Sequence, residues 1–237
     1  MKPQLAADTW VYLSASPLLG LTLTLVAYQL AFWIYRRSGK MALANPVLLA
    51  IIIITSFLLL TNTLYTRYFE GAQFVHFLLG PATIALAVPL YAQWPRLKRL
   101  AFPLIVALFA GSATAAFSAV AIAKLLGATP GTVYSLAPKS VTTPIAMGVA
   151  EQIGGIPSLT AVMVILTGII GAIGFPALFR ILRINDQAAQ GFAVGIAAHG
   201  LGTARAFLIS EEMGAFSALA MGLNGILTAV MLPLLLR

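Results

Sequence analysis

The chain has 237 residues, of which 60% are hydrophobic and only 8% are charged, and its mean hydropathy is +0.98. Soluble domains carry about 25% charged residues, so this composition excludes a soluble fold and predicts an integral membrane protein. The formal net charge of +8 does not indicate nucleic-acid binding, because the basic residues occur in short clusters between apolar segments and form no basic face.

Four apolar spans are predicted in the first half of the chain, each long enough to cross a hydrocarbon core of about 30 Å. They are Trp10–Tyr35, Val47–Thr63, Phe74–Tyr91 and Phe102–Leu126. Asn45 and Pro46 mark the beginning of the second span. Basic clusters at Arg36–Lys40 and Arg96–Arg99 place the loops after the first and third spans in the cytoplasm, by the positive-inside rule.

The second half differs, because glycine, proline and short polar residues interrupt two of its apolar segments. The uninterrupted span 157–181 lies between the interrupted segments 131–155 and 185–214, and a last span begins at Ala215. If segment 131–155 is re-entrant, the chain crosses seven times and Arg180 and Arg183 are cytoplasmic. If it crosses, there are eight crossings and these arginines face out, so the positive-inside rule favours re-entry.

This order of segments predicts an all-α integral membrane protein with about seven to eight transmembrane or re-entrant helices, two of them broken. Each interrupted segment is followed by an uninterrupted span, which is compatible with an inverted repeat. We expect one membrane domain, 1–237, in which residues 10–126 form apolar scaffold-like helices and residues 131–237 carry the site. Glycines 168, 171 and 174, spaced by three, predict close helix packing.

The first polar cluster lies between two prolines in the segment 131–155. Pro138 and Pro144 are six residues apart and disfavour helix between them, so Lys139–Thr143 is predicted to be non-helical. Such backbone is tolerated at membrane depth only where it is buried in protein or lines a cavity. Thr143 is expected to cap a helix that begins at Pro144 and points its positive end at the break.

A small anion suits this first cluster, because bare N–H groups, a positive helix end and a lysine ammonium all attract negative charge. The candidate binding residues are Lys139, Ser140, Thr142, Thr143 and Pro144. The alternative is a plain proline kink in which Lys139 extends to the membrane interface.

The second polar cluster lies in the segment 185–214. Gly200 and Gly202 weaken a helix there, and Thr203 is expected to cap a second half-helix that begins near Ala204. His199 can exchange a proton near neutral pH, and Arg205 can bind a carboxylate through two hydrogen bonds.

Structural roles are the alternatives for the two ionisable residues of this second cluster. His199 can instead make an interhelical hydrogen bond, and Arg205 can pair with Glu211 or Glu212. The G-x-G spacing at Gly200 is no dinucleotide fingerprint, because no strand precedes it.

Three polar residues outside these clusters have simpler expectations. Glu151 is either a proton-coupling carboxylate or an exposed residue in a loop. Asn224 is expected to bond to a neighbouring helix, and Asp186 to cap the helix that follows it.

The chain contains no cysteine, which excludes disulfides, thiol catalysis and cysteine-ligated metals. His76 and His199 are its only histidines and lie far apart in the sequence. We therefore expect no metal and no other cofactor. Ser140 or Ser158 would need His199 as a base for hydrolysis, and no nucleophile elbow or paired catalytic carboxylates are present, so no enzyme is expected.

The sequence resembles the LrgB/CidB family. The resemblance rests on several motifs that together cover nearly the whole chain: 138–146, 153–159, 199–204, 214–217, Asn45-Pro46 and 81–91. It implies a multi-pass protein of the bacterial cytoplasmic (inner) membrane, also similar to the C-terminal part of the plant plastidial glycolate/glycerate translocator. It further implies a smaller LrgA/CidA-type membrane protein as a partner, and homodimers are common in related-looking carriers.

Two functions follow from the resemblance and the clusters together. The first is secondary transport of small monocarboxylates of the pyruvate, glycolate or glycerate class by alternating access, with His199 or Glu151 coupling protons. The alternative is a holin/antiholin-like pore or regulator that affects murein hydrolase export and cell lysis. A pore needs a polar lining across the whole membrane, whereas these polar groups are concentrated in two short stretches, so the sequence favours a carrier of a small organic anion within the bilayer.

Overall fold

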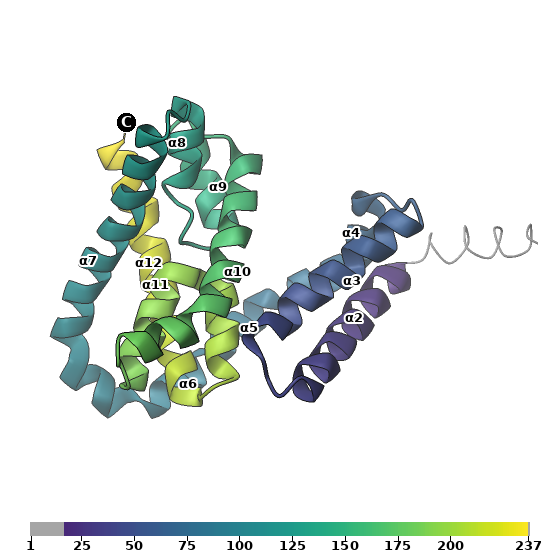
Figure 1. Cartoon of the computed structure of the whole chain (residues 1–237), viewed down its shortest axis with the longest axis horizontal. Helices are drawn as coiled ribbons and strands as arrows, with labels where there is room; N and C mark the ends of the chain where they lie inside the picture. Colours follow the sequence, from purple (N-terminus) through teal and green to yellow (C-terminus); the bar gives the residue numbers. More distant parts are fainter. Residues whose placement is uncertain (1–16, 237) are drawn as a thin grey trace, which may run out of the picture. The chain divides into compact units, whose positions relative to one another are not determined.

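The computed structural model describes residues 17–236, except the side chains of residues 17, 42, 76, 79 and 83. The regular elements in this part of the chain are all helices, and four of them are long and apolar enough to cross a membrane (Figure 1). The all-α membrane fold is therefore confirmed. The predicted start of the first span at Trp10 lies outside the described residues. The chain forms two compact units, residues 1–85 and 86–237.

The first unit contains α2 (Pro17–Arg37), the short 3-10 helix η1 (Ala42–Ala44), α3 (Pro46–Leu60), α4 (Tyr65–Phe77) and α5 (Leu79–Ala85). Helix α3 begins one residue before the predicted second span. The predicted third span, Phe74–Tyr91, does not form one helix, because the chain turns at residues 78 and 86. Asn45 caps α3 as its side chain accepts the backbone N–H of Val47 at 2.9 Å. Helix α2 packs against both α3 and α4, and the hydroxyls of Thr24 and Tyr68 bond across the second contact at 2.7 Å.

The second unit contains the two polar clusters. Its helices are α6 (Ala87–Ala92), α7 (Trp94–Leu125), α8 (Pro130–Leu136), α9 (Thr143–Gln152), α10 (Pro157–Ile181), α11 (Gln187–Phe207) and α12 (Glu211–Leu235). Helix α7 begins before the predicted span, so the basic cluster Arg96–Arg99 forms its first turns. Pro95 is compatible with this start, because an N–H in the first turn has no partner within the helix. Contacts thus place α7 with the broken helices, whereas the sequence grouped it with the earlier spans.

Helices α8 and α9 form a pair, named here the first hairpin, whose turn at residues 137–142 is the first tip. After α9 the chain returns to the side of α8, where the backbone N–H of Ile156 donates to the Ser135 hydroxyl at 2.7 Å. Val133 and Ile153 share one apolar cluster for the same reason. The first tip is non-helical, as predicted, and the hairpin has the shape that re-entry requires, while re-entry itself stays a prediction.

Helix α11 also turns back, and its two halves are named the second hairpin, with residues 198–200 as the second tip. His199 leaves the helical region, at φ 39° and ψ −134°. A β carbon on Gly202 would lie 2.7 Å from Val194 Cγ1, although eight residues of continuous helix span about 12 Å. The outgoing half therefore folds against the incoming half, and segment 185–214, counted from the sequence as a crossing, also has the shape that re-entry requires.

The predicted position of this second break was wrong by several residues. The sequence placed a new half-helix near Ala204 with Thr203 as its cap, whereas the break lies at His199 and the outgoing half already includes Thr203. The Thr203 hydroxyl donates to the His199 carbonyl at 2.7 Å, the back-bond to residue i−4 that threonine makes inside a helix.

Helices α10 and α12 each contact both hairpins, but they meet the two hairpins in opposite order along the chain. In α10, Val164 packs against the first tip and Phe179 against the second hairpin. In α12 the order is reversed, because Met213 packs against the second hairpin and Leu232 against the first. The first hairpin with α10 and the second hairpin with α12 are therefore related as an inverted repeat, as the sequence suggested.

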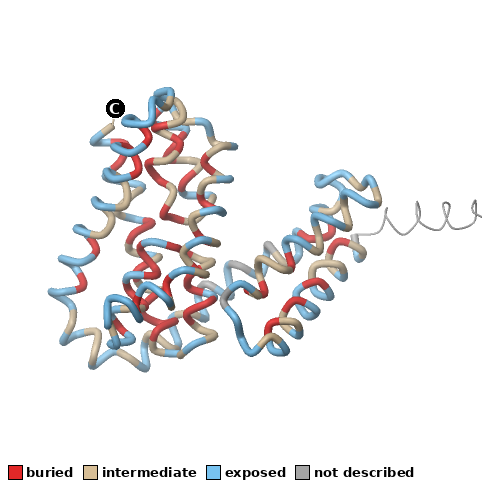
Figure 2. The backbone as a smooth tube through the Cα atoms, in the orientation of Figure 1, coloured by how far each residue is buried: buried red, intermediate tan, exposed pale blue. Residues whose placement is uncertain are grey.

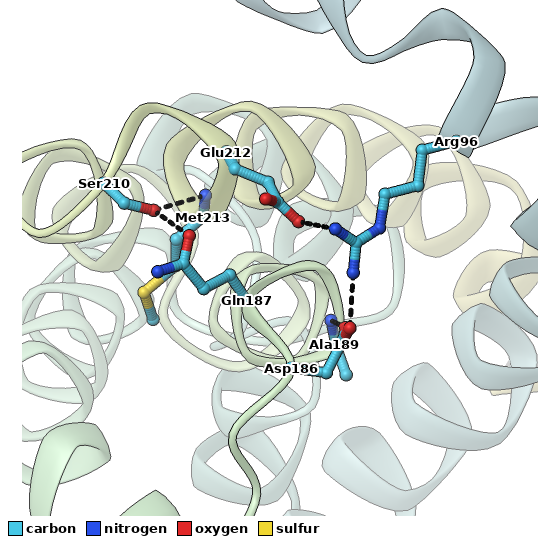
Figure 3. A network of polar contacts seen from close by, with 7 residues as sticks. All are labelled: Arg96, Asp186, Gln187, Ala189, Ser210, Glu212 and Met213. Atoms are coloured by element: carbon cyan, nitrogen blue, oxygen red, sulfur yellow. Dashed lines mark hydrogen bonds and ion pairs between the residues drawn. The ribbon is translucent and has the colours of Figure 1, made fainter.

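One ion-pair network fixes the start of three helices at the same end of this unit (Figure 3). Arg96 of α7 pairs with Glu212 of α12 at 2.5 Å and also with Asp186, which caps α11 by accepting the N–H of Ala189 at 2.8 Å. The end of α10 lies just before Asp186 in the chain, so the basic residues of the 180–183 stretch share this end with Arg96. The positive-inside rule predicted this arrangement.

Glycines allow the second hairpin to pack tightly on its neighbours, where buried residues gather (Figure 2). A β carbon on Gly195 would overlap the Ser217 carbonyl of α12, and one on Gly171 would lie 2.5 Å from Ala198 Cβ. A β carbon on Gly168 would lie 2.7 Å from the His199 ring, whereas one on Gly174 would have no atom within 4 Å. The predicted close packing is thus confirmed at two of the three spaced glycines.

Replacing Gly195 by alanine is therefore expected to destabilise the protein. The added methyl group meets backbone of α12 that cannot move aside, and overpacking of this kind costs about 1–3 kcal/mol. The matched control is Gly222→Ala in α12, where nothing lies within 4 Å. Thermal unfolding in detergent should show a lower midpoint for Gly195→Ala and an unchanged or higher one for Gly222→Ala; equal midpoints would contradict the close approach of α11 and α12.

Candidate functional site

The two tips meet at the middle of α10. Val164 packs its side chain against Val141 and Ala146 of the first hairpin, and its carbonyl lies 2.9 Å from His199 Nε2 of the second tip. Gly168, four residues further along α10 or about 6 Å, leaves the space that the His199 ring occupies. One turn of α10 therefore contacts both breaks.

Asn224 of α12 joins the same two segments by hydrogen bonds. Its amide nitrogen donates to the carbonyl of Ser140 at 3.3 Å and to that of Ile196 at 3.1 Å. Its amide oxygen accepts the Ser112 hydroxyl of α7 at 2.5 Å. Asn224 is 1% exposed. Carbonyls near a helix break lack intrahelical partners, so this side chain satisfies groups that would otherwise be costly at membrane depth.

The first tip presents a cation beside a helix N-terminus. Lys139 is half-buried and donates to the hydroxyl of the buried Ser140 at 3.2 Å. Helix α9 begins at Thr143 with Thr142 as its N-cap, because the Thr142 carbonyl accepts the N–H of Ala146 at 2.9 Å. The predicted cap, Thr143, was therefore one residue too late. The Lys139 ammonium comes four residues before the positive end of α9. A cation and a helix N-terminus in this order favour binding of an anion.

The second tip is held in an unusual conformation. His199 is 4% exposed and has a positive φ of 39°, which is uncommon for a residue with a side chain. Thr203 stabilises this conformation, because its hydroxyl donates to the His199 carbonyl and lies 2.8 Å from the Ser217 hydroxyl. The interhelical hydrogen bond expected as the alternative for His199 is present, with Val164. Such strain persists where surrounding contacts impose it, and it is common at functional sites.

The other predicted residues divide between the tips and the hairpin ends. A β carbon added to Gly200 would lie 3.8 Å from the Met221 sulfur. Gly202 is buried inside the second hairpin. Pro144 is exposed in the first turn of α9. Arg205 is buried in the outgoing half of α11, away from the tip, and its predicted partner Glu212 pairs with Arg96.

Glu151 also lies away from the tips. It is exposed in the last turn of α9, about 12 Å along the helix from Thr143. The structure thus brings the first tip, with Lys139 and Ser140, and His199 of the second tip to the same helix, α10. Glu151 and Arg205 are not part of this group.

A small void adjoins the first tip. It measures about 10 Å³ and is bordered by Ser140, Asn224 and Ser112 among others, and a void of this size holds about one water molecule. A three-carbon acid does not fit into this void.

Other chemistries have little support at the tips. Among residues 17–236 with described side chains, no group of three or more metal-ligating residues occurs. His199 Nε2 lies against a carbonyl and the Ser140 hydroxyl accepts from Lys139, so these two residues do not form a nucleophile–base pair.

Three polar residues at the junction were not assigned to it from the sequence. They are Ser112, Ser217 and Asn224. The signal was present for Asn224, because an amide in an apolar span needs a partner, and the expected interhelical bond is confirmed. The sequence could not show that its partners are the two breaks.

Comparison with known families identifies the family of this chain. The model of the LrgB-like family matches residues 24–237. The chain belongs to the LrgB-like family. No solved structure matches the chain significantly.

Individual relatives of this LrgB-like chain are similar over almost their full length. It is 40% identical over 219 residues to YwbG of Bacillus subtilis (strain 168), which covers 92% of this chain and 97% of that protein. It is 34% identical over 212 residues to YxaC of the same organism, with 90% and 92% covered. It is 32% identical over 220 residues to the antiholin-like protein LrgB of Bacillus cereus (strain B4264), with 92% and 95% covered.

Replacing Asn224 by leucine tests whether this residue holds both tips of the LrgB-like chain. The change leaves two buried carbonyls without a donor, at about 1–3 kcal/mol each, so we expect a lower unfolding midpoint. Hydrogen–deuterium exchange should also rise at residues 137–142 and 196–200 together.

The control for this change is Asn185→Leu, the same substitution at an exposed position before α11. It should leave both readouts unchanged. Faster exchange at one tip alone in Asn224→Leu would show that Asn224 does not connect the two breaks.

Proposed function

We propose that this protein is a secondary carrier of a small organic anion, of the pyruvate, glycolate or glycerate class. One observation carries the proposal: two hairpins from opposite ends of the unit meet at Val164 and Asn224, and Lys139 lies beside Ser140 in the tip of the first hairpin. Broken helices related by an inverted repeat, with helix ends directed at a midplane site, are the usual design of secondary carriers. As a multi-pass membrane protein of the LrgB-like family, it is proposed to act in the bacterial cytoplasmic membrane.

In the proposed mechanism the Lys139 ammonium and the N-terminus of α9 bind the carboxylate. Hydroxyls of Ser140, Thr142 and Thr143 bond the hydroxyl or keto oxygen of the substrate. Because the two hairpins enter from opposite ends, movement of either one exposes the tips to one side only. The void of about 10 Å³ at the first tip is consistent with a closed conformation that precedes binding.

Proton coupling is proposed for His199 rather than for Glu151. His199 lies at the junction of the two tips, and an imidazole can exchange a proton near neutral pH. Glu151 is exposed at the far end of α9, where it meets solvent or headgroups. Thr203 is proposed to orient the second tip through its bond to the His199 carbonyl, while a direct contact of Arg205 with the anion requires rearrangement of the second hairpin.

The second candidate function is an antiholin-like role, a regulator of murein hydrolase export and cell lysis. The name of the Bacillus cereus relative supports this role directly, and the comparisons favour it over transport. An LrgA/CidA-type membrane subunit is the proposed partner in either case. The geometry gives a pore little support, because the buried polar side chains Ser140, His199, Thr203 and Asn224 gather at and beside the two tips.

Uptake of radiolabelled pyruvate, glycolate and glycerate into liposomes with the purified protein tests the carrier. We expect saturable uptake that an imposed pH gradient accelerates. Lys139→Ala should lower it by about tenfold or more, because a charge-assisted hydrogen bond contributes about 1.5–3 kcal/mol. His199→Gln should retain uptake but lose the acceleration.

The matched control is Lys124→Ala, which removes an exposed lysine at the end of α7 and should leave uptake unchanged. Equal uptake by Lys139→Ala and the unaltered protein would contradict the assignment of Lys139. Absence of uptake with and without a co-reconstituted LrgA/CidA-type subunit, together with unsaturable conductance in planar bilayers, would favour the antiholin-like function.

A further inference from the structure

A long apolar groove runs between α7 and the incoming half of α11, outside the tips. It measures about 600 Å³ and is lined mainly by apolar residues, of which Leu100, Ala107, Ala110, Phe192, Ala193 and Ile196 are representative. From Leu100 to Ala115 it extends for about 22 Å along α7, more than the roughly 15 Å depth of one leaflet of hydrocarbon. Its length and polarity match a lipid acyl chain.

The groove ends at a cluster of positive charge. Arg96 and Arg99 precede Leu100, the first residue of α7 in the lining, by at most four residues, so both lie at this end of the groove. Arg96 is held by Asp186 and Glu212 (Figure 3), so the one acidic residue of the lining, Asp186, is already paired.

Arg99, in contrast, is exposed and makes no ion pair with any residue in the described range 17–236. Its guanidinium is therefore available to a negatively charged group at this end of the groove. Arginine binds phosphate oxygens through two parallel hydrogen bonds.

We infer that this groove binds an anionic phospholipid, with an acyl chain between α7 and α11 and its phosphate at Arg99. Basic residues at the membrane end of a space between helices are the recognised signature of such lipid sites. A second copy of the chain fits less well, because each copy carries a net charge of +8 and its own Asp186 and Glu212 are paired with Arg96.

Titration of the purified protein with phosphatidylglycerol and, separately, with phosphatidylcholine tests this inference by native mass spectrometry. Phosphatidylglycerol should bind about tenfold more tightly, and Arg99→Gln should remove most of that preference. Ala193→Trp, which fills the groove, should weaken binding of both lipids. Arg180→Gln, an exposed arginine at the same end of the unit, is the control and should keep the preference.

Three results would overturn the site. They are equal binding of the two lipids, an equal loss of preference in Arg180→Gln and Arg99→Gln, and a dimer that Ala193→Trp dissociates while lipid binding persists. The last result would assign the groove to a second copy. None of these readouts depends on transport, so the inference and the proposed function are tested separately.

Discussion

The structure depends on the satisfaction of broken backbone inside a membrane. Where a helix ends within hydrocarbon, its carbonyl and N–H groups have no water to bond, and each unsatisfied group is costly. Two such breaks occur here, and the same two neighbouring residues contact both of them. Asn224 donates to carbonyls beside both breaks, and Val164 meets one tip with its side chain and the other with its carbonyl. The inverted repeat brings the two breaks to one level, so the same helices serve both.

A junction of this kind is suited to movement. Only a few hydrogen bonds join the tips, and the positive φ of His199 shows that the surrounding contacts hold the backbone in a disfavoured region. Small displacements of a hairpin therefore exchange one set of partners for another, which is what alternating access requires. An anion at Lys139 would neutralise the ammonium beside His199 and so favour one arrangement over the other. The ion-pair network around Arg96 instead fixes the helix starts at one end and gives the hairpins a stable base.

The sequence predicted local features well and long-range ones poorly. Two prolines six residues apart were enough to predict the first tip, and Asn45 and Asp186 were recognisable as caps, because these effects act within a few residues. The second tip was displaced from its predicted place at Thr203 to His199, because glycines on both sides made several break points equivalent and tertiary contacts with Val164 and Gly168 decided between them. Likewise Arg205 has the chemistry of an anion ligand, but the fold places it in the outgoing half of the hairpin. Only the three-dimensional arrangement shows that Asn224 belongs to the site.

The central claim is that both hairpins enter and leave on their own side of the membrane. Because the chain contains no cysteine, single cysteines at Thr129 and Gln152, which flank the first hairpin, and at Asn185 and Ile209, which flank the second, can each be labelled with an impermeant maleimide in oriented membranes. Thr129→Cys and Gln152→Cys should react from one side, and Asn185→Cys and Ile209→Cys should both react from the other. Labelling of Asn185→Cys and Ile209→Cys from opposite sides would contradict it, since α11 would then cross the bilayer and the two tips would not meet.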